Sequence, residues 1–354
     1  MTHPYQTLPD HAFWRKAVSE KSPLQLTDVY KKKYEISPAD VIATAGSCFA
    51  QHIARFLVKN GYNFHDFEPA PPLLRREDHS KFGYGVFSAR YGNIYTVRQL
   101  LQTFRRAFDE FTPAACHWHH KGRYFDSLRP AIEPNGFASL EELEASRRTH
   151  LRAVRQLFTQ SDVFIFTLGL TEAWLSRDDR LAFPLCPGTI AGEFDERKHV
   201  FHNFTAAEIY EDFKLFVTSL RRVNPDVRIL LTVSPVPLTA TASKDHVMVA
   251  SSYSKAVLRS IAGEFSSTYD FIDYFPSYEL VAAHPMRAMF FEPNMRTVAT
   301  EGVEIVMSHF FREHPPQKGA WREAKGGARV RKGKPPSPDE DDVVCEEMLL
   351  DQAL

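Results

Sequence analysis

The sequence contains few cysteines, and they form none of the spacings that bind zinc or build a disulfide scaffold. Only Cys48, Cys116, Cys186 and Cys345 occur among 354 residues, and no two of them make a Cys-x-x-Cys pair. Widely separated cysteines in a chain of this size are typical of thiols that stay reduced. The cysteines therefore predict a reducing compartment, no structural metal and no disulfide framework.

Segments that would carry the chain to a membrane are also lacking. The first residues, MTHPYQTLPDHAFWRK, contain no basic stretch followed by an apolar one, and apolar runs such as VFIFTLGL are far too short for a membrane span. The formal net charge is -1 and the pI is about 7.0, so no overall field attracts nucleic acid or an anionic membrane. We expect a cytoplasmic protein without a membrane span or a nucleic-acid partner.

Strong metal or cofactor motifs are missing as well. Neither GxxxxGK[ST] nor GxGxxG is present, so the common nucleotide-binding loops are not predicted. His117, His119 and His120 cluster in CHWHH, but this spacing without a nearby carboxylate is not a usual zinc pattern. An exposed loop is the favoured interpretation of the cluster. The sequence thus predicts no cofactor and no metal site.

What the chain does have is apolar sequence arranged in alternating strands and helices. Its hydrophobic content of 44% is enough for a large core. Buried strands are predicted at residues 41–45 (VIATA), 162–168 (DVFIFTL) and 227–233 (VRILLTV), and a weaker one at 271–274 (FIDY). Amphipathic helices are predicted at 48–60, 206–223 and 252–265. This alternation predicts an α/β fold of three layers, α/β/α, in which helices cover both faces of a parallel sheet.

The rest of the chain divides around this core. Residues 1–40 are interpreted as an N-terminal extension and 41–314 as the main domain. Within it, residues about 62–150 form an insertion of loops and helices, placed to cap a cleft. The tail at 315–354 is predicted to be disordered, with a short helix in the terminal VVCEEMLLDQAL. That helix would dock on the body or on a partner; simple disorder is the alternative.

The first predicted strand leads through Gly46 and Ser47 into the first helix. A serine at such a junction directs its hydroxyl into the crevice at the carboxyl edge of a parallel sheet, where ligands bind. Free N–H groups and the helix dipole at this point stabilise a developing oxyanion. Gly46 allows the sharp bend and the close approach of a substrate. The alternative is that Ser47 only caps the helix.

The string Gly46-Ser47-Cys48-Phe49-Ala50 spells GSCFA, and several further segments accompany it: ARYGNIYT, TLGLTEAW, FHNFT, TVSPVPL and YFPSYE. In these segments, which run from about residue 43 to about 311, the chain resembles the GSCFA family, a branch of the SGNH/GDSL-like hydrolases. The resemblance implies an SGNH or flavodoxin-like parallel sheet. It also implies ester chemistry centred on a serine nucleophile.

The resemblance assigns roles to residues of the first two SGNH sequence blocks. Ser47 matches the nucleophile, and its own N–H would contribute to the oxyanion hole. The second block matches Gly92, whose N–H would be another oxyanion donor, with Asn93 beside it. Asn93 also has a structural interpretation, as a turn former before the strand-like IYTV.

The third block ends a strand and matches Gly169. An asparagine is expected here as an oxyanion donor, but Thr171 stands in its place and Glu172 follows. A threonine hydroxyl donates one hydrogen bond and is shorter than an amide, which departs from the family pattern. Helix capping after the strand is the alternative for both residues.

The last SGNH block, Asp-x-x-His, is replaced here. Asn294 and Thr297 stand where the aspartate and the histidine would be. The hypothesis for the missing base is His284, in the loop after the fourth strand, with Asp273 or Glu279 orienting it. A structural role for His284 is the alternative. His202 and the CHWHH histidines are more distant options.

Two classes of function follow. The first is a Ser47-dependent esterase or O-acyltransferase that forms an acyl-enzyme on an acylated polar substrate, a small molecule or a glycan; the glycan rests on family analogy. The second is a binding or scaffold protein that keeps the SGNH fold without catalysis. A base within reach of Ser47 would favour the enzyme.

Overall fold

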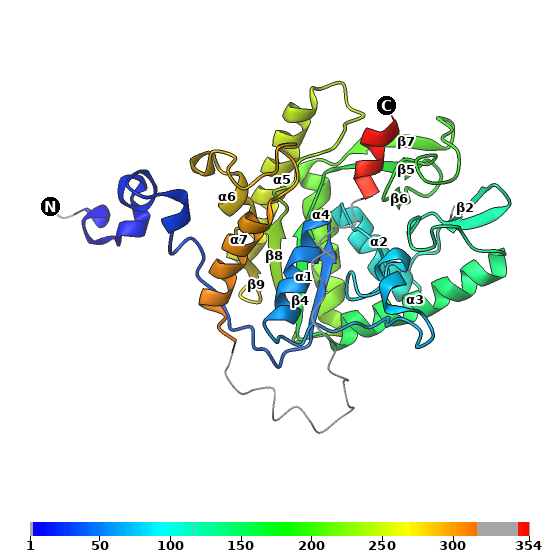
Figure 1. The fold of residues 1–354 in the computed structure, drawn as a ribbon, viewed down its shortest axis with the longest axis horizontal. Helices are drawn as coiled ribbons and strands as arrows, with labels where there is room; N and C mark the ends of the chain where they lie inside the picture. The colour runs from blue at the N-terminus through cyan, green and yellow to red at the C-terminus, as the bar shows by residue number, and fades with distance from the viewer. Residues whose placement is uncertain (1–2, 115, 317–345, 354) are drawn as a thin grey trace.

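The computed structural model describes residues 3–114, 116–316 and 346–353. At its centre is a parallel sheet in the order β1-β4-β8-β9 (Figure 1). Its strands are β1 (Ile42–Gly46), β4 (Val163–Leu168), β8 (Arg228–Val233) and β9 (Ile272–Tyr274). Each strand begins and ends within one residue of the strand expected from the sequence, which confirms the α/β fold with a parallel sheet. Residues 317–345, predicted to be disordered, lie outside the described residues.

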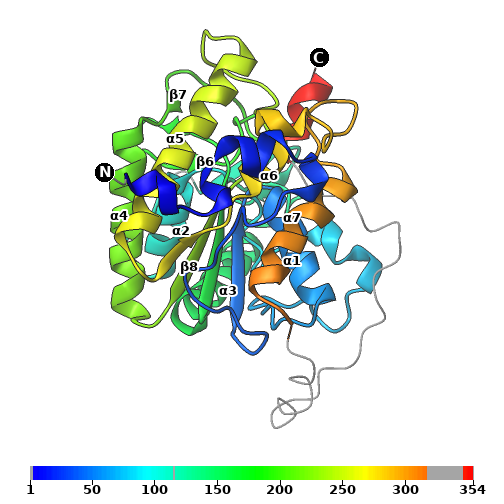
Figure 2. The same ribbon diagram turned by 90° about the vertical axis from the view of Figure 1, so that its left-hand side faces the viewer.

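The sheet is buried on both faces because side chains along each strand alternate between two cores. On β4, Phe164 and Phe166 belong to one core, whereas Val163 and Ile165 belong to the other. The first core is covered by α2 (Val97–Ala107), α3 (Leu140–Gln160), α4 (Ala206–Val223) and α5 (Val247–Thr268), and the second by α1 (Phe49–Lys59), α6 (Ser277–Ala282) and α7 (Thr300–Glu313). Continuous apolar strands require such cover on both faces. The three-layer α/β/α arrangement is therefore confirmed (Figures 1 and 2).

The order of the strands places a topological switch point beside β1. An isolated parallel bridge joins Ile42 to Phe64, so a reduced second strand lies on the side of β1 away from β4. With that bridge counted, the order is the 2-1-3-4-5 of flavodoxin-like sheets, in which ligands bind between the carboxyl ends of the first and third strands. In this chain the corresponding strands are β1 and β4.

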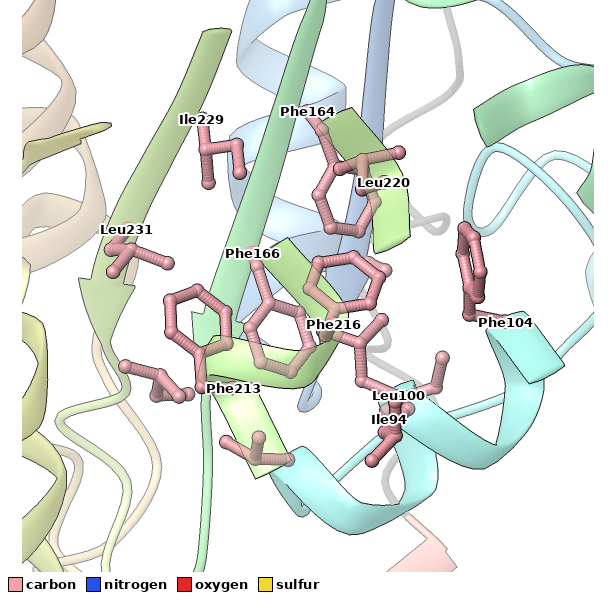
Figure 3. Close-up of a cluster of buried hydrophobic side chains, with 14 of the residues drawn as sticks. Ile94, Leu100, Phe104, Phe164, Phe166, Phe213, Phe216, Leu220, Ile229 and Leu231 are labelled. Carbon is pink, nitrogen blue, oxygen red and sulfur yellow. The ribbon is translucent and has the colours of Figure 1, made fainter. Parts of the chain in front are cut away.

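Aromatic packing fixes α2 against the sheet (Figure 3). Phe104 of α2 meets Phe216 of α4 edge-on, with ring centroids 5.9 Å apart, and Phe216 lies 5.9 Å from Phe164 of β4. Tilted and edge-on aromatic pairs of this kind stabilise by roughly 0.5–1.5 kcal/mol beyond the area they bury. Thr96 and Gln99 form a capping box at the start of α2. Both features hold the loop that precedes α2 at the edge of the sheet.

The insertion differs from the expectation of loops and helices. CHWHH was predicted to be an exposed loop, but it forms β2 (His117–His120), which pairs antiparallel with β3 (Arg123–Asp126). The prediction was wrong because alternation is the relevant pattern: Trp118 is buried while the histidines beside it face outward. Another antiparallel sheet, in the order β6-β5-β7, follows β4 and was not predicted. Its strands are β5 (Glu172–Ser176), β6 (Ala182–Phe183) and β7 (His199–Asn203).

Short helical turns make up much of the remainder. They are η1 (Pro4–Thr7), η2 (Asp10–Ala12), the π-helix η3 (Arg15–Ser19), η4 (Pro23–Gln25), η5 (Arg76–Asp78), η6 (Ser80–Phe82), η7 (His284–Met286) and η10 (Glu346–Ala353). Within the described ranges, no disulfide joins Cys48, Cys116 and Cys186 to one another. No helix in these ranges is both long and apolar enough to cross a membrane.

Candidate active site

Ser47 lies at the switch point, between the end of β1 and the start of α1. Its hydroxyl is buried and makes no hydrogen bond with any residue that the structure describes. It does not cap α1, because the capping position is Cys48 and no side chain caps the helix there. The Ser47 N–H donates to the carbonyl of Thr167 at 3.2 Å, so the expected contribution of this N–H to an oxyanion hole is not seen. A buried hydroxyl without a partner costs roughly 1–3 kcal/mol and calls for a functional explanation.

Gly46 makes this position possible. Its φ is +138°, and a Cβ at this position would lie 2.4 Å from the carbonyl oxygen of Thr167, its neighbour across the β1–β4 pairing. A side chain would therefore force β1 and β4 apart where Ser47 leaves the sheet.

Gly46→Ala is expected to lower the free energy of unfolding by roughly 3 kcal/mol or more, because backbone strain and overpacking add. The matched control is Gly122→Ala: Gly122 also has a positive φ, +74°, but nothing lies within 4 Å of its added Cβ. Strain alone should cost roughly 1–2 kcal/mol there. Urea unfolding of both variants measures the difference, and equal losses would contradict the importance of the Thr167 contact.

Two further segments converge on Ser47, as the sequence blocks predicted. The Ile94 N–H donates to the carbonyl of Gly46 and the Leu170 N–H to the carbonyl of Tyr95, both at 2.9 Å. The loop before α2 is therefore held between the ends of β1 and β4. A Cβ on Gly169 would come within 3.0 Å of the Ser47 Cβ, so only a glycine at this position leaves the serine its space. Gly169 and the Gly92–Asn93 loop thus flank the serine.

Thr171 and Glu172 do not take the roles expected of the third block. The Thr171 hydroxyl donates to Oδ1 of Asn203 at 2.6 Å, so its proton is not directed at an oxyanion. Glu172 begins β5 and accepts hydrogen bonds from the Thr241 hydroxyl at 2.8 and 3.0 Å. The alternative of helix capping is also wrong, because a strand and not a helix follows.

Gly92 and Asn93 face a carboxylate from the other end of the chain. Asn93 Nδ2 donates to Oε2 of Glu346 at 3.1 Å, and Oε1 of the same carboxylate would lie 3.3 Å from a Cβ on Gly92. Both residues lie in the loop before α2 rather than in a strand, and Gly92 has a φ of +69°. The Asn93 amide therefore donates to an acidic group, which also lies against Gly92.

Lys255 of α5 carries a buried amine beside Gly169. Its Nζ donates to the carbonyl of Gly169 at 2.8 Å, and only 4% of the residue is exposed. Burial lowers the pKa of Lys255 to about 8; the charge of Glu347 acts in the opposite direction, as does Cys48, and Arg296 lowers it further. An amine with this pKa exchanges protons near neutral pH.

His284 is not brought to Ser47. Its ring is exposed and stacks on Trp14 of the N-terminal extension, with centroids 5.4 Å apart and an interplanar angle of 18°. The buried Ser47 hydroxyl makes no hydrogen bond to it. The proposed orienting groups are engaged elsewhere: Asp273 accepts from Tyr30, and Glu279 accepts from Arg259 and Tyr274. The structure thus supports the alternative of a structural role for this histidine.

The other histidine options lie on different elements. His202 of β7 bonds Glu208 at 2.8 Å, and the CHWHH histidines lie on the β2–β3 hairpin. In the described part of the chain, no group of three His, Cys, Asp or Glu side chains is placed to hold a metal ion.

The loop in which the resemblance predicted the catalytic dyad contributes an arginine. Asn294 and Thr297, which stand where the dyad was expected, are both exposed, and the Asn294 amide donates to the Thr297 hydroxyl at 2.9 Å. Between them, Arg296 forms an ion pair with Glu347 at 3.2 Å. Figure 2 shows the C-terminal helix η10, drawn in red, beside this loop, which precedes α7 in the sequence. The loop in which the dyad was expected therefore presents a cation, Arg296, to Glu347.

Sequence reasoning missed Lys255, Arg296 and the two glutamates of η10. A signal for Lys255 was available, because it lies on the same helical face as Ser251 and Leu258, which are both buried. A lysine within a buried stripe is unusual unless it is paired or functional. Glu346 and Glu347 gave no such signal, because a predicted disordered tail separates them from the rest of the chain.

Comparison with known proteins agrees with this arrangement of segments. The sequence profile of the GSCFA family matches residues 41–310, which span β1, the switch point and nearly all of α7. No match was found among proteins of curated function. The match covers most of the chain, and the chain belongs to the GSCFA family.

Proposed function

We propose that the protein is a Ser47-dependent acyl-transfer enzyme, an esterase or an O-acyltransferase, with Lys255 as the base. One observation carries the proposal. The Ser47 hydroxyl is buried without a hydrogen bond to any described residue, and it lies against Gly169, whose carbonyl binds the amine of Lys255. A serine beside a buried lysine is a known alternative to the serine–histidine pair.

In the proposed reaction, the Ser47 oxygen bonds to the carbonyl carbon of an ester while its proton passes to the neutral amine of Lys255. The carbonyl oxygen becomes an oxyanion, and the Asn93 amide would donate to it. The bond to the leaving alcohol then breaks, and the alcohol takes the proton from the Lys255 ammonium. Water releases the acyl group in an esterase, whereas a hydroxyl of a polar acceptor such as a glycan accepts it in a transferase.

Labelling with a fluorophosphonate probe tests the nucleophile. The wild-type chain should be labelled and Ser47→Ala should not, because the probe reacts with activated serines. Ser234→Ala is the matched control: Ser234 is also buried and follows β8 at the same edge of the sheet, but its oxygen accepts a hydrogen bond from the Val236 N–H. This variant should label like wild type. Absence of labelling in every variant would favour a binding protein with the SGNH fold, because Ser47 would then not be activated.

A further inference from the structure

The C-terminal helix η10 places two acidic side chains in the Ser47 site. Glu346 and Glu347 are only 5% and 8% exposed, although glutamate is among the residues least often buried. In Figure 1 the helix, drawn in red, lies above α1 and α2, beside β5–β7. Residues 317–345, between α7 and this helix in the sequence, lie outside the described part. A docked C-terminal helix was one of the two outcomes predicted for the tail.

Each glutamate meets a different part of the site. The Glu346 carboxylate accepts from Asn93 Nδ2 at 3.1 Å and lies against Gly92, where the proposed reaction places an oxyanion. The Glu347 carboxylate pairs with Arg296 at 3.2 Å and interacts electrostatically with Lys255. The two glutamates therefore occupy a hydrogen-bond donor next to Ser47, the Asn93 amide, and the cationic region formed by Arg296 beside Lys255.

The balance of charge explains why the helix docks here. Removing an ion from water costs several kcal/mol unless an opposite charge and hydrogen bonds replace the solvent. Lys255 is 4% exposed and the Arg296 side chain 12%, and the charged carboxylate that acts on Lys255 belongs to η10. Without the helix, the site would lose the Glu347 carboxylate that pairs with Arg296 and acts on Lys255. Such a site selects an anion.

We propose that Arg296, next to Lys255, forms an anion-binding subsite for a substrate carboxylate, and that η10 occupies it as an internal ligand which the substrate displaces. The substrate class is then an ester whose acyl or alcohol part carries a carboxylate. This identification of the substrate rests on the function proposed for Ser47. The contact between η10 and the subsite does not depend on that function.

The test uses the full chain and a readout that needs no catalysis. In E346Q/E347Q, hydrogen exchange of the amides in residues 346–353 and 92–96 should become at least roughly 10-fold faster, because neutral side chains cannot form the ion pair with Arg296 that holds the helix. E301Q/E304Q is the matched control, since it removes the same charge from exposed positions of α7 and should leave both segments unchanged. R296Q breaks the same ion pair from the body and should reproduce the faster exchange.

Titration then identifies the ligand. Succinate should slow the exchange of residues 92–96 in E346Q/E347Q, whereas succinamide should not, and R296Q should abolish the effect. Protection by inorganic phosphate but not by succinate would overturn the assignment to a carboxylate. Unchanged exchange in both E346Q/E347Q and R296Q would overturn the subsite itself.

Fluorophosphonate labelling separates this proposal from the proposed function. Ser47 should label at least roughly 10-fold faster in E346Q/E347Q than in wild type, since the internal ligand no longer occupies the site. Slower labelling would mean that the glutamates serve the reaction, and would overturn their role as occupants. If no variant is labelled while exchange responds as expected, the proposed function fails and the anion subsite stands.

Discussion

Lys255→Met should lower ester turnover, or fluorophosphonate labelling of Ser47, by roughly 10²-fold or more, because a positioned general base usually contributes 10²- to 10⁴-fold. Methionine keeps the length of the side chain and its packing in α5 but removes the amine that binds the Gly169 carbonyl. Lys255→Arg keeps the positive charge without a proton that can be lost near neutral pH. Loss of activity in both variants would identify Lys255 as a base rather than only a cation.

The proposed role of Lys255 also predicts how turnover depends on pH. The reaction requires the neutral amine, so turnover should rise as the pH increases through about 8, the pKa that burial gives to Lys255. The titratable and charged groups that act on this amine are Cys48 at the N-cap of α1, Arg296 from the loop before α7, and Glu347 from η10. Because the Glu347 carboxylate raises the pKa of Lys255, Glu347→Gln should move the midpoint to lower pH.

Lys33→Met is the control for the loss of a lysine that binds backbone carbonyls. Lys33 Nζ donates to the carbonyls of Tyr269 and Ile272 at 3.0 and 2.8 Å, at the amino end of β9 and away from the site. Its removal should leave turnover and labelling unchanged. A folded Lys255→Met chain that labels at the wild-type rate, or an active Lys255→Arg, would contradict the proposed role.

The parallel sheet was predictable because burial on both faces leaves a local signal. Each strand is a short, continuous apolar run, and one such run, VFIFTL, is recognisable without its neighbours. The hairpin β2–β3 was not predictable in this way. Its strands have few apolar residues, and only the alternation around Trp118 indicates a half-buried strand. Short strands with mixed composition depend on the surface on which they pack.

The candidate site likewise has residues that local sequence predicts and residues that depend on long-range contacts. Ser47, Gly92 and Gly169 follow from sequence blocks, and hydrogen bonds between those blocks bring them together. The base did not follow, because topology places His284 after β9 but cannot predict that its ring stacks on Trp14. This contact joins two residues, Trp14 and His284, that lie 270 positions apart in the sequence. The carboxylates of η10 depend on a long-range contact of the same kind.

A loss of stability in mild acid is the other large effect that we expect. Two buried histidines stay neutral in the folded chain. His150 is 1% exposed and its Nδ1 lies 2.7 Å from a carboxylate oxygen of Glu68, while burial and the nearby Arg129 lower its pKa to about 4. His314 accepts at Nδ1 from the Ile36 N–H at 3.1 Å, and burial lowers its pKa to about 4 as well.

Stability falls in acid because the unfolded chain takes up protons at a higher pH than the folded chain. An unfolded histidine binds a proton near pH 6.5, whereas these two resist protonation until about pH 4. Their contribution to stability is therefore complete above pH 6.5 and is lost as the pH falls from 6.5 to 4. The loss is roughly 3 kcal/mol per histidine, since one pKa unit corresponds to about 1.4 kcal/mol. Losses of this size are a large fraction of the stability of a typical domain.

Urea unfolding of wild type, His150→Gln and His119→Gln at pH 7.5, 5.5 and 4.5 measures this loss. Glutamine can still donate to Glu68 but cannot titrate, so His150→Gln should lose less stability between pH 7.5 and 4.5 than wild type, by roughly 3 kcal/mol. His119→Gln changes an exposed position of β2 and should follow wild type. Asp66, whose pKa burial raises to about 6, takes up a proton in the folded state and offsets part of the loss, but all three chains share this contribution. If wild type and His150→Gln fall in parallel, His150 is not the group that destabilises the fold in acid.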